Sequence, residues 1–208
     1  MAVDREARYA ALLLEWNRRL NLTGARTAED LAPHLRDARG LLEVSWERIA
    51  RVLDVGSGGG LPAIPLALAL PGVSFTLLDA NRRKAAFLEH VAGELAMDNV
   101  TVLSGRAEEL ARQPAHREAF DRVISRAAAR PAVLLELALP FVRVGGDLLA
   151  VVGEVEAGPL EPAARLLGAE PPWIERTRDG RPLLRTRKKQ ATPPDLPRRA
   201  GAMKRPLA

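Results

Sequence analysis

Short apolar runs alternate with helix-like stretches through the middle of the chain, and this alternation most constrains the fold. The apolar runs occupy residues 51–56, 74–79, 100–103, 120–125 and 146–153. The helix-like stretches occupy residues 62–70, 82–97, 106–112 and 130–139. Nearly continuous apolar runs are typical of strands buried on both faces of a parallel sheet. Strands joined by helices form right-handed βαβ units. We therefore predict an α/β fold built on an open, doubly wound sheet with helices on both faces.

The two ends of the chain add elements to this unit. Apolar residues at helical spacing predict an amphipathic helix over 5–20, and a second helix from about Ala32 or Pro33 to residue 42, since proline suits a first turn. An Asp179–Gly180 turn between two extended runs predicts a β-hairpin over 173–189. The predicted organisation is an N-terminal helical extension (1–49), an α/β domain (50–190) and a basic, proline-rich tail (191–208).

Composition excludes several classes of protein and of chemistry. The chain has 208 residues, of which 47% are hydrophobic, enough for one core. No apolar run is long enough to span a bilayer and the first turn is charged, so we expect a cytoplasmic protein without a membrane partner. The absence of cysteine excludes disulfides and thiolate chemistry. The three histidines (His34, His90 and His116) lack the spacing of metal ligands, so no metal site is predicted.

The positive charge is concentrated at the C-terminal end. Eleven lysines and arginines follow residue 175 against two aspartates, so this end carries +9 while the preceding chain carries −4 of the net +5. Such a cluster predicts a polyanionic partner, and nucleic acid rather than a membrane, because no apolar face accompanies it. From composition alone, a solvating or disordered tail is an equal alternative.

A glycine-rich segment, "DVGSGGGLP" (54–62), follows the first predicted strand. In open α/β sheets, ligands bind beyond the carboxyl ends of the strands, where the strand order reverses. Glycines at 56, 58 and 60 can adopt positive φ and let a ligand approach the main chain. Asp79 ends the second predicted strand, where a carboxylate can accept both hydroxyls of a ribose. The two features together predict a nucleoside cofactor.

The glycine spacing separates two classes of cofactor. A dinucleotide fingerprint, G-x-G-x-x-G, would place its third glycine where this chain has Leu61, so an NAD-dependent oxidoreductase is a remote alternative. Asp54, two residues before Gly56, suits the ammonium group of an amino-acid moiety. This combination resembles the Rossmann-like methyltransferases that use S-adenosylmethionine.

Further motifs extend this resemblance over nearly the whole chain. They are "NLT" (21–23), "HLRDA" (34–38), "FTLLDANRRKAAFL" (75–88), "GRAEEL" (105–110), "DRVISRA" (121–127), "PFVRVGGDLLAVVG" (140–153) and "PRRAG…KRPL" (197–207). In order and spacing they resemble the bacterial 16S ribosomal RNA guanine-N7 methyltransferases, the glucose-inhibited division protein B family. The chain departs from the family pattern at Ala38, where serine is common, at Val152, where lysine is usual, and at Leu196, which replaces an aromatic residue.

The glycine loop and the resemblance together predict the cofactor site. Its members are Asp54, Gly56, Ser57, Gly58, Gly60, Leu61, Asp79, Ala107, Glu108 and Arg126. By the resemblance, Ala107 and Glu108 flank the adenine, and Arg126 contacts the methionine end or organises the methyl-transfer cleft. The position of Arg126, at the end of the fourth predicted strand, independently places it beside this cleft.

The implied reaction makes few demands on catalytic side chains. The N7 lone pair of guanine lies in the ring plane and needs no deprotonation, so the enzyme has to align the reacting atoms rather than supply a base. Arg126 is the predicted catalytic residue. The lack of cysteine excludes methylation at C5 of cytosine, and "SRAAAR" does not resemble the Asn/Asp-Pro-Pro-aromatic element of amino-group methylases.

The predicted RNA surface combines the helical extension with the basic end. Its members are Asn21, Thr23, His34, Arg36, Lys188, Lys189, Arg198 and Arg199, with Arg18, Arg19 and Arg39 beside them. The expected partner is 16S ribosomal RNA or the 30S particle, bound by a monomer. Two alternatives remain open: a small-molecule methyltransferase with the same cofactor unit, and a non-catalytic RNA-binding assembly factor that keeps a vestigial pocket.

Overall fold

The described part of the chain forms one seven-stranded sheet in a computed structural model, which describes residues 4–126, 128–205 and 207. The strands are β1 (Arg51–Val55), β2 (Ser74–Asp79), β3 (Val100–Ser104), β4 (Phe120–Arg126), β5 (Val142–Val151), β6 (Trp173–Arg176) and β7 (Pro182–Arg187). Their order is β3-β2-β1-β4-β5-β7-β6. β1 to β5 are parallel, and the β6–β7 hairpin is antiparallel to β5. The predicted α/β fold and its hairpin are confirmed.

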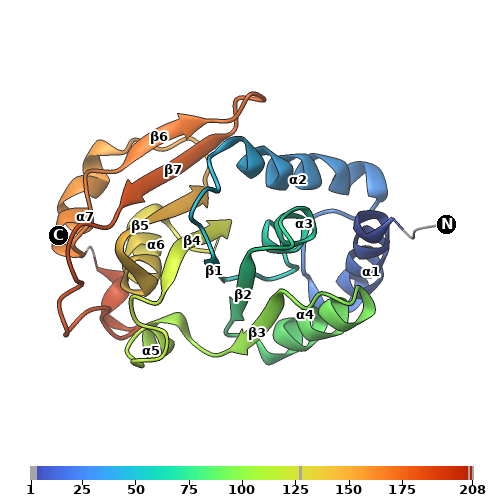
Figure 1. Ribbon diagram of the computed structural model, residues 1–208, viewed down its shortest axis with the longest axis horizontal. Coiled ribbons are helices and arrows are strands. Elements are labelled where there is room, and N and C mark those ends of the chain that lie inside the picture. The colour runs from blue at the N-terminus through green and yellow to red at the C-terminus, as the bar shows by residue number, and fades with distance from the viewer. Residues whose placement is uncertain (1–3, 127, 206, 208) are drawn as a thin grey trace.

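Helices cover both faces of this sheet (Figure 1). The α-helices are α1 (Arg5–Leu20), α2 (Ala28–Gly40), α3 (Ala63–Ala69), α4 (Arg82–Glu94), α5 (Ala107–Leu110), α6 (Pro131–Ala138) and α7 (Glu161–Leu166). Short 3-10 turns occupy Leu41–Glu43, Leu139–Phe141, Gly158–Leu160 and Ala202–Lys204. Within the described residues, no helix is both long and apolar enough to cross a bilayer.

The continuous apolar runs are explained by two cores, one on each face of the sheet. In β1, Val52 packs in the core beneath α1 to α4, whereas Leu53 and Val55 pack in the core beneath α6 and α7. Successive side chains of a strand point to opposite faces, so a strand covered on both faces is apolar at both. Asp54 lies within this strand, and it is the buried polar exception.

The sheet differs from the prediction at the start of β5. This strand begins at Val142 rather than at residue 146. Val142 pairs with Phe120, and pairing resumes at Asp147 with Arg122 across an irregularity. Gly145 and Gly146 lie in this irregular part, and glycine there hid the strand because glycine is depleted in strands.

The second helix also begins earlier than predicted, at Ala28 rather than near Ala32. Thr27 accepts a hydrogen bond from the Asp30 amide at 3.2 Å, and the Asp30 carboxylate accepts one from the Thr27 amide at 3.0 Å. This reciprocal pair is a capping box. Pro33 therefore lies inside the helix instead of at its first turn.

The predicted N-terminal extension packs into the same core as the α/β unit. The Arg5 side chain donates to the Leu95 carbonyl at 2.6 Å, and Arg8 pairs with Glu94 at 2.7 Å. The Trp16 and Phe87 rings lie 5.7 Å apart. These contacts hold α1 along α4, as Figure 1 shows. The extension thus covers the helix that follows Asp79.

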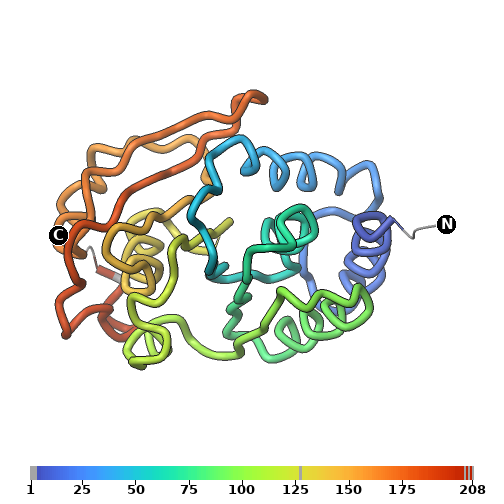
Figure 2. The backbone as a smooth tube through the Cα atoms, in the orientation of Figure 1, coloured from blue at the N-terminus to red at the C-terminus, as the bar shows by residue number. Residues whose placement is uncertain are grey.

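The predicted basic tail is also bound to the body over its described residues. The Arg117 side chain donates to the carbonyls of Thr192 at 2.8 Å and Leu196 at 2.9 Å, and Arg112 donates to that of Asp195 at 2.7 Å. Leu196 is 5% exposed. Figure 2 shows this C-terminal segment at the end of the molecule opposite to α1.

Candidate active site

The glycine loop lies at the carboxyl end of β1, beside the reversal of strand order between β1 and β4. Gly56, Gly58 and Gly60 have φ of 75°, 56° and 88°. A Cβ on Gly56 would lie 2.6 Å from the Ala128 side chain. The amides of Gly56 and Ser57 donate to the Leu78 carbonyl at 2.9 and 3.0 Å, which fastens the loop to β2. The loop therefore presents bare main chain at the sheet edge where open α/β proteins bind ligands.

A cavity of about 370 Å³ adjoins this loop. It brings together five of the predicted cofactor residues: Gly56, Gly58, Asp79, Ala107 and Glu108. The predicted residues Asp54, Ser57, Gly60 and Leu61 are buried at the loop and do not line the cavity. Two cations that were not predicted, Lys84 and Arg106, also line it. Arg106 directly precedes Ala107 in the "GRAEEL" motif, so the motif could have indicated it.

Asp79 closes the cavity at the end of β2. One carboxylate oxygen accepts a hydrogen bond from the Gly58 amide at 2.9 Å, and the other accepts one from the Asn81 amide at 2.8 Å. Each carboxylate oxygen can accept more than one hydrogen bond. The carboxylate is thus oriented by the glycine loop and keeps acceptor capacity for a diol.

Asp54 is a fully buried carboxylate without a hydrogen-bond partner for either oxygen. The Ser57 hydroxyl donates to the backbone carbonyl of Asp54 at 2.9 Å rather than to its carboxylate. Burial raises the pKa of Asp54 to about 8. A buried, unpaired carboxylate is costly unless a donor reaches it. An ammonium group would satisfy it, so these residues fit an amino-acid-bearing nucleoside.

Arg126 ends β4 and lines a second cavity of about 350 Å³. His34 and Asp37 of α2 line the same cavity, together with Val152 and Arg181. The Arg181 side chain donates to Asp37 at 2.9 Å. Burial lowers the pKa of Arg126, and burial followed by the nearby Arg126 charge lowers the pKa of His34. A cationic guanidinium and a neutral imidazole therefore face the space next to the cofactor cleft.

Replacing Gly60 by alanine is expected to destabilise the protein and to distort the loop. The new Cβ would lie 2.6 Å from an Ile64 side-chain carbon, at a φ of 88°. A left-handed backbone costs a residue with a Cβ roughly 1–2 kcal/mol, before any clash. Thermal denaturation should show a loss of at least a few degrees in Tm. Gly93→Ala is the matched control, since nothing lies within 4 Å of its Cβ, and an equal loss in both variants would contradict the assignment.

Four predicted RNA-binding residues come from the N-terminal helices and the loop between them. Asn21 and Thr23 line a polar hollow of about 560 Å³. The Asn17 side chain shapes this loop, because its oxygen accepts from the amides of Leu22 at 2.6 Å and Thr23 at 2.9 Å. Arg36 is exposed on α2, whereas His34 lies in the cavity of Arg126.

The prediction that Lys188 binds RNA is wrong. Lys188 is fully buried; its ammonium group donates to the Leu139 carbonyl at 3.0 Å and to the Thr192 hydroxyl, and lies 3.7 Å from the Glu118 carboxylate. The neighbouring Lys189 is exposed and pairs with Glu170 at 2.9 Å. Neighbouring residues of an extended chain point to opposite sides, which the composition could not reveal.

Most of the basic end is paired with carboxylates of the body. Arg198 pairs with the buried Glu136 at 2.8 Å. Further ion pairs join Arg176 to Glu154 at 2.8 Å, Arg181 to Asp37 at 2.9 Å and Arg185 to Asp147 at 3.2 Å. Of the four predicted residues at this end, Lys189 and Arg199 are exposed, whereas Arg198 is partly buried. The basic end is thus partly a structural element, with a smaller surface for RNA than its charge suggests.

Lys188→Ala is expected to destabilise the fold by on the order of 3 kcal/mol, because it leaves buried acceptors and a carboxylate without their cation. Lys189→Ala, one residue away, removes only an exposed pair and should change stability by less than about 1 kcal/mol. Urea denaturation of the two variants measures the difference. Equal stabilities would show that the buried ammonium group does not anchor the C-terminal segment.

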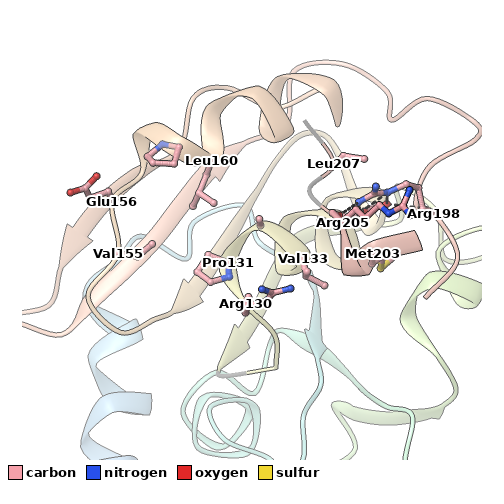
Figure 3. Close-up of a pocket in the computed structure, with 13 residues that line it drawn as sticks. Arg130, Pro131, Val133, Val155, Glu156, Leu160, Arg198, Met203, Arg205 and Leu207 are labelled. Carbon is pink, nitrogen blue, oxygen red and sulfur yellow. Dashed lines mark hydrogen bonds and ion pairs between the residues drawn. The ribbon is translucent and has the colours of Figure 1, made fainter. Parts of the chain in front are cut away.

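An apolar cavity of about 370 Å³ lies between α6, the segment that joins β5 to α7, and the C-terminal residues. Figure 3 shows Pro131 and Val133 of α6 on one side, Leu160 on another, and Met203 and Leu207 closing it from the C-terminal end. None of the predicted cofactor-loop residues lines it. The C-terminal segment therefore completes an apolar wall of the molecule.

Comparison with known proteins identifies the family. The family described as rRNA small subunit methyltransferase G matches residues 4–167. The chain belongs to this family. The ribosomal RNA small subunit methyltransferase G of Deinococcus radiodurans is 40% identical over 212 residues, covering 95% of this chain and 82% of the relative. The protein of the same name from Desulfitobacterium hafniense is 38% identical over 215 residues, covering 99% of this chain and 89% of the relative. The resemblance inferred from the motifs is confirmed.

Solved structures agree on the fold of this member of the methyltransferase G family. The S-adenosylmethionine-dependent methyltransferase SibL in its apo form superposes with a TM-score of 0.62 at 18% identity, covering 91% of this chain and 71% of that one. A putative O-methyltransferase from Klebsiella pneumoniae superposes with a TM-score of 0.56 at 20% identity, covering 88% and 90%. The predicted Rossmann-like methyltransferase fold is confirmed.

Proposed function

We propose that the protein transfers a methyl group from S-adenosylmethionine to N7 of one guanine in 16S ribosomal RNA. The observation that carries the proposal is the buried, partnerless Asp54 carboxylate under a glycine loop that faces Asp79. It occurs in a chain 40% identical to a relative named for the small ribosomal subunit RNA. The reaction takes place in the cytoplasm, and the protein acts as a monomer.

The chain's own residues account for binding of the cofactor. Asp54 holds the ammonium group, Asp79 accepts the ribose hydroxyls, and Ala107 and Glu108 flank the adenine. Gly58 lets the ligand lie against main-chain atoms. Bound S-adenosylmethionine supplies a sulfonium methyl group as the electrophile.

The second cavity, lined by His34, Arg126 and Val152, is the acceptor cavity, which receives the guanine. Its N7 lone pair needs no base, so alignment of the reacting atoms within roughly 3–3.5 Å is the main task of the protein. Arg126 donates hydrogen bonds that orient the base or the methionine end, and arginine is suited to this because its donors form a rigid fork. His34, whose pKa is lowered by burial, stays neutral and adds no charge beside the cationic cofactor.

The RNA surface surrounds this cavity on the N-terminal helices. Asn21, Thr23 and Arg36 contact the RNA there, and the exposed Lys189 and Arg199 add phosphate contacts from the C-terminal end. Val152 lines the acceptor cavity where the family pattern has lysine. An apolar side chain at this point leaves Arg126 and Arg181 as the cations of the cavity.

Labelled S-adenosylmethionine tests the proposal directly. The purified protein is incubated with 16S RNA, with 30S particles, or with a pool of small metabolites, and methylated guanine is located by mass mapping. We expect the label in one N7-methylguanosine of the RNA. Label in a small molecule would instead show a small-molecule methyltransferase. RNA binding without label would show an assembly factor.

A further inference from the structure

A further polar pocket, of about 400 Å³ and distinct from the cavities described above, lies at the opposite edge of the sheet from the glycine loop. Residues that precede or begin β1 and β4 form it, together with residues of β5 and β7. The glycine loop follows the other end of β1, five residues away. A strand rises by about 3.3 Å per residue, so the two sites are separated by at least one strand length.

The pocket contains an excess of positive charge. Its cationic lining residues are Arg48, Arg122, Arg143, Arg185 and Arg187. Its carboxylates are Glu47, Asp121 and Asp147. Two arginines are therefore in excess over the carboxylates.

The register of the sheet places three of these arginines around one carboxylate. Asp147 of β5 pairs with Arg122 of β4 on one side and with Arg187 of β7 on the other. Residues opposite one another on paired strands share a face, and so do residues two apart on one strand. Arg185, two residues before Arg187 on β7, therefore lies on the same face. Strand pairing, rather than closeness along the chain, brings Arg122 to the two arginines of β7.

Two of the three carboxylates of this pocket, Asp147 and Asp121, are already hydrogen-bonded within the protein. Asp147 accepts two hydrogen bonds from Arg122, at 2.7 and 2.8 Å, and one from Arg185 at 3.2 Å. Asp121 accepts one from Arg143 at 2.6 Å and two from the amides of residues 50 and 51 at 2.8 Å.

Donors in the pocket are left over. No ion pair within 4.0 Å joins Arg48 or Arg187 to a carboxylate in the part of the chain that the structure describes. The Nε of Arg185 is buried and has no hydrogen-bond partner. A buried donor without a partner is costly, so this atom points to an acceptor that the protein itself does not supply.

We propose that this pocket binds a phosphate group of the RNA substrate, at a point remote from the methyl-transfer cleft. The guanidinium fork of arginine matches phosphate oxygens, which accept several charge-assisted hydrogen bonds. Arg48 and Arg187 supply the uncompensated charge, and Arg185 supplies the unpaired donor. Phosphate contacts fix the orientation of a nucleic acid without reading its sequence. The proposal rests on the proposed RNA substrate.

An Arg48→Ala/Arg187→Ala double variant tests the pocket, because both side chains are exposed and neither is in the catalytic machinery. Binding of a 16S RNA transcript is measured by filter retention over a range of salt concentrations. The logarithm of the binding constant falls linearly with the logarithm of the salt concentration, and the steepness of this line should decrease by about one for each RNA phosphate that the variant no longer neutralises. At low salt the affinity should fall about tenfold, which corresponds to about 1.4 kcal/mol. Cofactor affinity and methyl transfer at saturating RNA should stay within twofold of the wild type.

The matched control is Arg83→Ala/Arg165→Ala, which removes two exposed arginines from α4 and α7. If the salt dependence of RNA binding in the pocket variant equals that of the wild type, or falls equally in the control, the phosphate pocket is overturned. Methylation of the RNA by these proteins would then still support the proposed function. Inorganic phosphate at constant ionic strength should compete with RNA in the wild type and not in the pocket variant. Phosphate binding that leaves RNA affinity unchanged would reveal a free-anion site and overturn the RNA contact. A wild type that neither binds nor methylates the RNA would overturn the proposed function itself.

Discussion

Replacing Arg126 by alanine is expected to reduce methyl transfer by a factor of about 100 or more at saturating cofactor and RNA. Its guanidinium group lines the acceptor cavity and forms no hydrogen bond with the described residues. It is therefore available to a ligand. Loss of one preorganised donor at a reacting centre typically costs roughly 10²–10³ in rate. Single-turnover transfer of a labelled methyl group to RNA measures the effect.

Two controls separate the roles of Arg126. Arg126→Lys retains the charge without the planar fork and should recover only part of the rate, since the two side chains differ in geometry. Calorimetry of cofactor binding should show a change of less than about tenfold in Kd, because Asp54 and Asp79 remain. Undiminished transfer by Arg126→Ala would refute a catalytic role. A large rise in Kd with a normal rate at saturation would assign Arg126 to the methionine end alone.

The local patterns predicted most of the fold because they report on burial directly. Each strand from β1 to β4 begins where its apolar run begins, since both faces of the sheet are covered. Two of the errors fall where one local signal competes with another. Pro33 suggested a helix start and concealed the capping box at Thr27, and the glycines before Asp147 concealed the first part of β5.

The cofactor site was predictable for the same reason, and the RNA surface was less so. The glycine loop and Asp79 are consecutive strand ends, so the spacing in the chain sets their place in space. The partners of the basic residues lie far away along the chain: Glu118 lies 70 residues before Lys188, and Glu136 lies 62 before Arg198. Charge counted along the sequence cannot show such pairing, and it overestimated the free cations of the tail.

Asp54→Asn is expected to stabilise the ligand-free protein and to weaken cofactor binding, a combination that a purely structural carboxylate would not show. The carboxyl group is fully buried and both of its oxygens lack partners, so the folded protein must either take up a proton or bury a charge there, and a neutral amide of the same shape avoids both costs. The same change removes a charge-assisted hydrogen bond to the ammonium group, about 1.5–3 kcal/mol or roughly 10- to 150-fold in Kd. Urea denaturation and calorimetry measure the two effects.

The pH dependence gives this prediction a sign that can be checked. Burial raises the pKa of Asp54 to about 8 in the folded protein, from 3.8 in the unfolded chain. Between these values the folded protein keeps a proton that the unfolded chain has lost, so wild-type stability falls as pH rises, by at most about 1.4 kcal/mol per unit. Asp54→Asn lacks this pH-dependent component. The difference in free energy of unfolding between the variant and the wild type should therefore grow from pH 5 to 8 in favour of the variant and level off above pH 8. Since the cofactor's ammonium favours the ionised carboxylate, wild-type affinity should rise over the same range and binding should release a proton. Equal slopes in the two proteins would mean that Asp54 is already ionised and paired in the folded state.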